Sequence, residues 1–84
     1  MYKILLFADN GCPQCQYVKE TLKKYGFFNY TEIDVDDPDT QALRDKYSVK
    51  QVPYVVIFKG DCVVATRLLN SKEDVMWLVH TWDL

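Results

Sequence analysis

Two cysteines separated by two residues, Cys12 and Cys15, are the residues with the clearest chemistry in this chain. They follow an apolar run at residues 4–7 and open a stretch with helical periodicity. A thiol at the start of a helix lies at the positive end of the helix dipole, which favours the thiolate over the thiol. A second thiol one turn further on is close enough to form a disulfide with the first. The pattern therefore indicates thiol–disulfide exchange.

The position of each cysteine predicts its role. We expect Cys12 to attack the substrate disulfide, because the free backbone N–H groups of the first helical turn stabilise S⁻. Cys15 lies on the apolar face of the expected helix, so it is the residue that would attack the mixed disulfide and release the reduced substrate. Pro13 suits the first helical position and stiffens the turn. We expect the Cys12–Cys15 disulfide to be the redox group, with no further cofactor.

A zinc site is the main alternative use of such a pair. A structural zinc site needs about four ligands, and the remaining candidates are Cys62 and His80. Neither has a partner at metal-binding spacing, so we expect no metal. We interpret Cys62 as an inert strand residue, with a regulatory thiol as the alternative, and His80 as a surface residue near the end of a helix.

Composition limits the setting and the partners. The chain has 84 residues and a net charge of −2, which gives no reason to expect nucleic acid or an anionic membrane as a partner. It has no apolar segment long enough to span a bilayer. Strand-like residues follow Met1 directly, and the number of cysteines is odd. We therefore expect one domain, residues 1–84, that is monomeric, has no signal peptide and works in a reducing cytoplasm.

Hydrophobic periodicity predicts four strands and three helices. The expected strands are residues 2–7, 28–35, 54–58 and 62–67. The first helix begins at Pro13 and ends at Gly26, a short second helix begins after Asp37, and Asn70 or Ser71 caps the third. Apolar stripes are expected on the first helix at Cys15, Val18, Leu22 and Tyr25, and on the last at Val75, Leu78, Val79 and Trp82. The order β-α-β-α-β-β-α predicts an α/β fold with a four-stranded mixed sheet flanked by three helices.

This pattern resembles the thioredoxin superfamily, and its glutaredoxin branch most closely. The resemblance rests on Cys12-Pro13-Gln14-Cys15 at the end of the first strand, on Val52-Pro53 just before the third strand, and on the element order. It implies a thioredoxin fold and a protein-disulfide reductase that acts as an electron carrier. It also implies that the Val52–Pro53 bond is cis and faces the cysteine pair. The resemblance implies that the substrate contacts Pro13, Gln14, Gln51, Val52 and Pro53.

The chain also departs from glutaredoxins that bind glutathione. They carry a cation where this chain has Asp9, tyrosine in place of Gln14, threonine in place of Gln51, and a Gly-Gly pair with an acidic residue where it has residues 68–71. Thioredoxins have tryptophan where this chain has Gly11. We therefore expect weak glutathione recognition and recycling mainly by a protein reductant such as a thioredoxin reductase, with glutathione as the alternative.

Two classes of function stay open. The first is a dithiol reductant of protein disulfides, for which ribonucleotide reductase is a client by family analogy alone. The second is a thioredoxin-fold binding module that docks a partner without redox turnover. The intact Cys-Pro-x-Cys motif favours the reductant.

Overall fold

The computed structural model describes residues 2–82, which form four strands and three α-helices. The strands are β1 (Tyr2–Ala8), β2 (Thr31–Asp34), β3 (Tyr54–Lys59) and β4 (Cys62–Leu68). The helices are α1 (Pro13–Lys24), α2 (Gln41–Lys46), which follows a 3₁₀ turn at Pro38–Thr40, and α3 (Lys72–Trp82). The strands lie in the order β2-β1-β3-β4, with β1 parallel to β2 and antiparallel to β3. The predicted mixed sheet and element order are confirmed.

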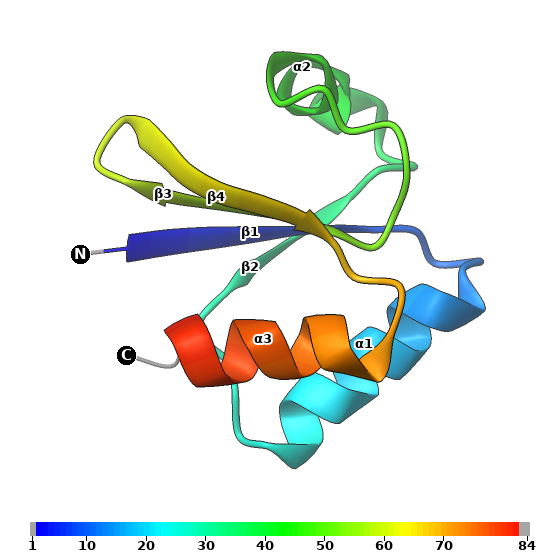
Figure 1. The fold of residues 1–84 in the computed structure, drawn as a ribbon. Coiled ribbons are helices and arrows are strands. Elements are labelled where there is room, and N and C mark those ends of the chain that lie inside the picture. Colours follow the sequence, from blue (N-terminus) through cyan, green and yellow to red (C-terminus); the bar gives the residue numbers. More distant parts are fainter. Residues whose placement is uncertain (1, 83–84) are drawn as a thin grey trace.

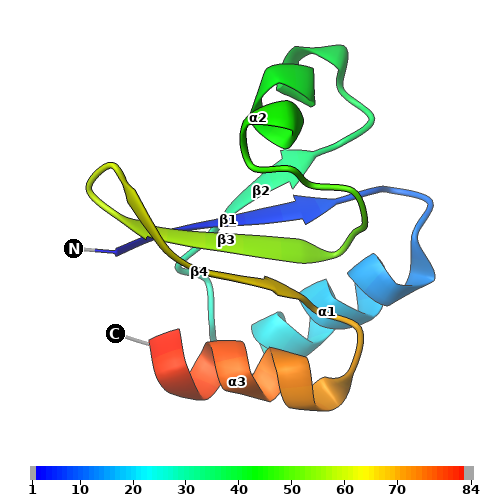
Figure 2. The same ribbon diagram turned by 45° about the horizontal axis from the view of Figure 1, so that its top comes forward.

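The sheet is covered on both faces. Helices α1 and α3 lie on one face and α2 on the other (Figures 1 and 2). Side chains of a strand alternate between its faces, so the apolar run of β1 supplies two cores. Ile4 and Leu6 pack in the cluster that contains Val18 of α1 and Leu78 of α3. The side chains between them pack in a second cluster, which includes Val49, Val56 and Leu43 of α2.

The second strand is shorter than predicted. The sequence predicts a strand over residues 28–35, but β2 begins at Thr31. This strand is at the edge of the sheet and pairs only with β1. Before it, the chain turns, since the N–H of Tyr30 donates to the carbonyl of Phe28 at 2.9 Å, and the Phe28 side chain is 67% exposed. Residues 28–30 have no neighbouring strand with which their backbone N–H and C=O groups could pair. The alternating sequence pattern therefore overestimates the length of the strand.

The end of α1 also differs from the prediction. Tyr25 is the C-cap residue and is 43% exposed, so it does not continue the apolar stripe. Gly26 follows in the left-handed region with φ of 69°, as its sequence position predicts. The N–H of Phe27 donates to the carbonyl of Leu22 at 2.9 Å. The buried Phe27 ring therefore closes the apolar face that Tyr25 was expected to close.

The strand register determines where the site lies. Phe7 pairs with Tyr54, so the carboxyl end of β1 and the amino end of β3 lie at the same end of the sheet. Helix α1 begins just beyond this end of the sheet (Figure 2). The register brings the segment that contains Cys12 and the segment that precedes β3 to the same end of the molecule.

Candidate redox site

Cys12 is the N-cap residue of α1. Its backbone is extended, with φ of −100° and ψ of 110°, and Pro13 occupies the first helical position. The Cys12 Sγ accepts a hydrogen bond from the backbone N–H of Cys15 at 3.1 Å. Both cysteines are free thiols in the structure. The first turn of the helix thus directs an N–H donor at the Cys12 sulfur, as the sequence predicts.

The two thiols differ in their surroundings. Cys12 is half-buried, whereas Cys15 is 1% exposed. Burial raises the pKa of the Cys15 thiol to about 11, and its hydrogen bond with Cys12 adds to the shift. At neutral pH Cys15 is therefore protonated. The arrangement presents one accessible sulfur with a hydrogen-bond donor and keeps a second sulfur inside the protein as a thiol.

An acidic pair lies beside the cysteines. The Oδ1 of Asp9 accepts the N–H of Gly11 at 2.9 Å, and its carbonyl accepts the N–H of Cys12 at 3.2 Å. The hydrogen bond from Gly11, followed by one with Asp36, lowers the pKa of Asp9. The same contact with Asp9 raises the pKa of Asp36. Asp9 therefore carries negative charge at the turn that leads into Cys12.

A hollow of about 220 Å³ opens next to Asp9 and Asp36. It is lined by carboxylates, by cations and by the segment before β3: Asp9, Val35, Asp36, Arg44, Val49, Lys50, Gln51 and Val52. The Nε of Arg44 is buried and has no hydrogen-bond partner among the described residues. The structure therefore brings Gln51 and Val52, which the resemblance assigns to substrate contact, into one surface with Asp9.

The predicted cis bond at Val52–Pro53 is confirmed. Pro53 is buried and Val52 is half-buried, while Gln51 is exposed. Because Tyr54 pairs with Phe7, Pro53 lies at the sheet edge from which β1 leads to Asp9 and Cys12. Pro13 is exposed at the start of α1, and Gln14 is half-buried.

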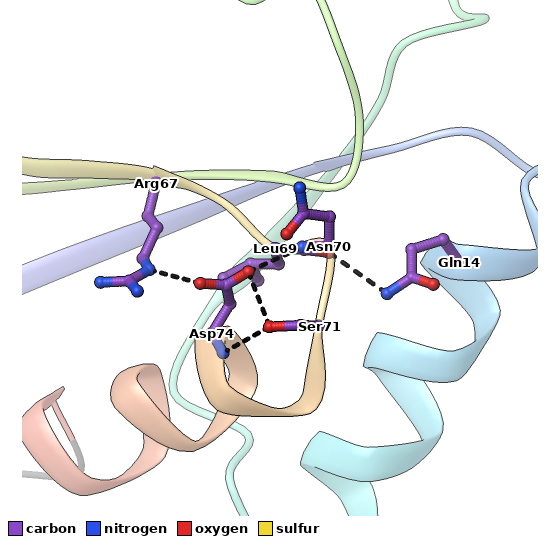
Figure 3. Close-up of polar contacts among 6 residues, drawn as sticks. All are labelled: Gln14, Arg67, Leu69, Asn70, Ser71 and Asp74. Carbon is purple, nitrogen blue, oxygen red and sulfur yellow. Dashed lines mark hydrogen bonds and ion pairs between the residues drawn. The ribbon is translucent and has the colours of Figure 1, made fainter.

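Sequence reasoning noted residues 68–71 as a departure from glutaredoxins that bind glutathione, but it did not find the contacts that this loop between β4 and α3 makes with the site. Gln14 donates from Nε2 to the carbonyl of Leu69 at 3.4 Å (Figure 3). The N–H of Leu69 in turn donates to the carbonyl of Pro53 at 2.8 Å. Leu69 thus connects the motif between the two cysteines with the proline before β3. Contacts between residues this far apart in sequence leave no local pattern, so none could have predicted them.

The other candidate residues lie elsewhere. Cys62 is exposed and pairs with Lys59 at the end of the β3–β4 hairpin away from the edge at Tyr54. His80 is exposed in the last turn of α3. Within residues 2–82, no three His, Cys, Asp or Glu side chains are placed to hold a metal ion. No helix in that range combines the length and the apolar character needed to cross a membrane.

Solved structures define the class of fold. The oxidised thioredoxin from Plasmodium falciparum superposes with a TM-score of 0.72 at 20% identity, covering 99% of this chain and 82% of that one. The thioredoxin of Malassezia sympodialis superposes with a TM-score of 0.79 at 13% identity, covering 99% and 78%. The protein therefore has a thioredoxin-like α/β fold, as predicted.

Sequence comparison then gives the family. The glutaredoxin family model matches residues 4–63, so the chain belongs to the glutaredoxin family, and it carries the Cys12–Cys15 pair as free thiols. A relative in Bacillus subtilis (strain 168), N-acetyl-S-hydroxy-L-cysteine reductase, is 35% identical over 60 residues. That match covers 69% of this chain and 63% of the relative. The chain thus spans less than two thirds of the length of this relative.

Proposed function

We propose that this protein reduces protein disulfides, with Cys12 as the nucleophile and Cys15 as the resolving thiol. The asymmetry of the pair carries the proposal. Cys12 is partly accessible and its sulfur accepts the N–H of Cys15 at 3.1 Å, whereas Cys15 is buried and its pKa is raised to about 11. An accessible thiolate is the attacking species in exchange, and a buried thiol waits until a mixed disulfide forms next to it.

The reaction is a two-electron exchange in two steps. The Cys12 thiolate attacks one sulfur of the substrate disulfide, which breaks that bond and releases the first substrate thiolate. Cys15 then loses its proton as its sulfur attacks Cys12 Sγ. The mixed disulfide breaks, the second substrate thiol leaves, and the Cys12–Cys15 disulfide forms. The substrate gains two electrons from the two cysteine sulfurs and two protons, one from Cys15 and one from the solvent, which had taken up the proton of Cys12 when that thiol ionised.

The segment before β3 supplies the substrate surface in this proposal. Val52 is half-buried and lies with Gln51 in the hollow beside Asp9. A backbone in this position can pair with an extended substrate chain, as in the addition of a short strand. The proposal assigns Pro13, Gln14 and Pro53 to the same substrate surface. Pro13 is exposed and Gln14 half-buried at the start of α1, and Pro53 is buried directly after Val52.

We further propose that a protein reductant, such as a thioredoxin reductase, recycles the disulfide more efficiently than glutathione does. The ionised Asp9 repels an anionic tripeptide at the entrance to the pair. Arg67 does not compensate, because its Nε is paired with Asp74 at 2.7 Å. Arg44 and Lys50 share their hollow with the carboxyl groups of Asp9 and Asp36, which oppose their charge. A reducing compartment such as the cytoplasm would supply this reductant, and ribonucleotide reductase stays a client by family analogy alone.

A second candidate substrate follows from the Bacillus relative, whose name specifies an S-hydroxycysteine derivative. The same pair can carry out that reaction. The Cys12 thiolate attacks the sulfur of the S–OH group, and the hydroxyl leaves as water after it takes a proton from the solvent. Cys15 then attacks the mixed disulfide and releases the substrate thiol. Arg44 and Lys50 line the hollow with Val52 and are the cations there for a substrate carboxylate.

Single substitutions test the proposed roles. Insulin reduction by the wild-type protein, recycled with dithiothreitol, should be lost in Cys12→Ser. Cys15→Ser should still attack and should accumulate mixed disulfides that mass spectrometry detects. Cys62→Ser is the matched control and should retain full activity. A wild-type protein without reductase activity would indicate the binding module, and trapping by Cys12→Ser alone would reverse the two roles.

A further inference from the structure

The first residues of β1 have no strand partner on one side. The ladder between β1 and β2 begins at the pair of Leu5 with Thr31, whereas β1 itself begins at Tyr2 and pairs with β3 from that residue on. The chain turns at residues 28–30 before it enters β2, so none of the described strands lies beside residues 2–4 on that side. This open edge of β1 lies at the end of the sheet opposite the start of α1, and hence opposite the cysteine pair (Figure 1).

The open edge presents backbone donors and acceptors. The carbonyl of Ala8 accepts the N–H of Val35 at 3.0 Å, so the backbone groups of Ala8 are directed to the β2 side of β1. Backbone groups alternate in direction along a strand, and those of Ile4 and Tyr2 are therefore directed to the same side. The N–H of Ile4 and both groups of Tyr2 come before the first ladder pair. An extended peptide beside them would find the donor and acceptor positions that a neighbouring strand uses.

A hollow of about 480 Å³ lies along this edge. Its lining includes the aromatic side chains of Tyr2, Phe28, Tyr30 and Phe58. Tyr2 packs against the apolar cluster under α1 and α3, whereas Phe58 packs against the cluster under α2, so the hollow reaches both faces of the sheet. Phe28 is 67% exposed and is a large apolar side chain that a bound segment would cover. The hollow thus combines an open backbone edge with apolar contact area for side chains.

The charges around this hollow are positive. Lys3 is the one charged residue among the described residues that line it. The Nζ of Lys3 lies 6.0 Å from the ring centroid of Phe58, and the Nζ of Lys59 lies 5.7 Å from that of Tyr2, so an ammonium group flanks each face. The chain as a whole has a net charge of −2, so this positive charge is local. An acidic segment is therefore the partner that the charges favour.

We propose that the open edge of β1 is a docking site for an acidic, extended segment of a partner protein, which adds as a short strand beside residues 2–4. Three residues of such a strand span about 10 Å. The residue opposite Lys3 lies on the same face as Lys3, and an acidic side chain there pairs with its ammonium group. Its two neighbours point to the other face, where Tyr2 and Tyr30 favour apolar side chains. The site is separate from the cysteine pair, so a docked partner leaves Cys12 accessible.

Binding of two peptides to the wild-type protein tests the proposal. The probe is the peptide Thr-Val-Glu-Val-Thr with blocked termini, and its control has lysine in place of glutamate. In NMR titrations at millimolar concentration the glutamate peptide should shift the amide signals of Ile4 and Phe28 saturably and leave that of Cys15 unchanged. The lysine peptide should bind roughly three- to tenfold more weakly. No saturable shift of Ile4 with the glutamate peptide, or equal binding of the two peptides, would overturn the proposal.

Variants of the protein test the role of the charge. Lys3→Glu should reverse the preference, so that the lysine peptide binds the more tightly of the two. Lys72→Glu makes the same change of charge at the start of α3 and should retain the wild-type preference. An unchanged preference in Lys3→Glu, or an equal reversal in Lys72→Glu, contradicts the proposal.

A modified peptide tests the strand addition itself. N-methylation of the glutamate and of the valine after it removes the N–H groups that a parallel or an antiparallel strand would donate to Tyr2, so binding should be lost. Retained binding of the methylated peptide would mean that side chains alone hold the segment, against the proposal. Shifts of Ile4 that depend on protein concentration without any peptide would show that a second copy of this chain occupies the edge, and they would overturn the proposal as well.

Discussion

The Sγ of Cys12 accepts the backbone N–H of Cys15 at 3.1 Å, so the two cysteines are linked before any disulfide forms. The hydrogen bond also distinguishes the two cysteines: Cys15 provides the N–H donor and has a buried thiol, whereas Cys12 provides the sulfur that accepts. The pKa of Cys15 is raised to about 11, so its thiol is protonated at neutral pH. In the reduced protein Cys12 is therefore the sulfur that reacts first, and Cys15 reacts after the mixed disulfide has formed.

Alkylation should reveal this order. In the Cys62→Ser protein, iodoacetamide at neutral pH should modify Cys12 and leave Cys15 intact, because Cys15 is buried and protonated. Labelling of Cys15 should become appreciable only as the pH approaches about 11. Mass spectrometry of tryptic peptides measures both sites, and the unfolded protein, in which both react, is the control. Equal labelling rates in the folded protein at neutral pH would contradict the asymmetry.

The acidic pair beside the cysteines gives a second prediction. The contact with Asp9 is the main reason why the pKa of Asp36 is raised, so Asp9→Asn should lower the pKa of Asp36. Carboxyl NMR titration measures this shift directly. Asp34 also raises the pKa of Asp36 through its charge, but it is a smaller cause. Asp34→Asn should therefore have the weaker effect, and the opposite ranking would rule out the Asp9–Asp36 contact.

The charge of Asp9 should also affect the use of glutathione. Asp9→Lys should raise kcat/KM for glutathione, because it replaces a repulsive charge with an attractive one at the turn before Cys12. Solvent screens a charge at this position, so we expect a gain of only a few fold. Asp9→Asn is the matched control and should fall between the two, since it removes the charge and retains a side-chain oxygen for Gly11. Steady-state assays at two salt concentrations measure the effect, which should shrink at high salt.

Much of the fold could be predicted from local signals. The apolar run of β1 predicted a strand covered on both faces, and the spacing of Val75, Leu78 and Val79 predicted the buried face of α3. Local signals also placed Cys12 at the start of a helix, which the structure confirms. Errors arose where tertiary contacts decide, as at Tyr25, whose expected place in the core Phe27 takes.

The loop between β4 and α3 could be predicted only in part. The sequence predicted that Asn70 or Ser71 caps the last helix, and the structure shows Ser71 in that role, with its Oγ accepting the N–H of Asp74. The cap's link to Arg67 and the contact of Gln14 with Leu69 both depend on how the loop packs after folding. These contacts join elements through side chains and a loop, so periodicity and motif spacing do not contain them.

Two glycines offer a matched stability test. Gly26 has φ of 69°, and no other atom lies within 4 Å of the position that a Cβ would take, so Gly26→Ala adds no clash and its cost is conformational. We expect a loss of about 1–2 kcal/mol, as for an L-residue in the left-handed region. At Gly11 the φ is not left-handed and a Cβ would lie 3.8 Å from the nearest atom, Asp9 Oδ1. Urea unfolding should show little loss for Gly11→Ala, and equal losses would contradict this explanation.

The pH dependence of stability should identify Asp74 as an ionised cap. Desolvation acts to raise the pKa of Asp74 in the folded state, but the hydrogen bonds from Arg67, Asn70 and Ser71 outweigh it and lower the pKa. The contribution of Asp74 is therefore fully present above the unfolded value of about 3.9. That contribution is lost as the pH falls through the lower folded-state pKa. Asp74→Asn should therefore destabilise the protein at pH 7 by about 1–2 kcal/mol, the typical value of a helix cap with a charged acceptor.

The difference between wild type and Asp74→Asn should narrow as the pH falls below about 4, where the carboxylate of the unfolded wild-type chain begins to take up its proton. Urea unfolding midpoints at a series of pH values measure this. Arg67→Gln should cost less at pH 7, because the Arg67 side chain is 41% exposed and solvent screens its ion pair. A constant difference between wild type and Asp74→Asn down to a pH of about 2 would mean that the neutral acid caps the helix as well as the carboxylate does.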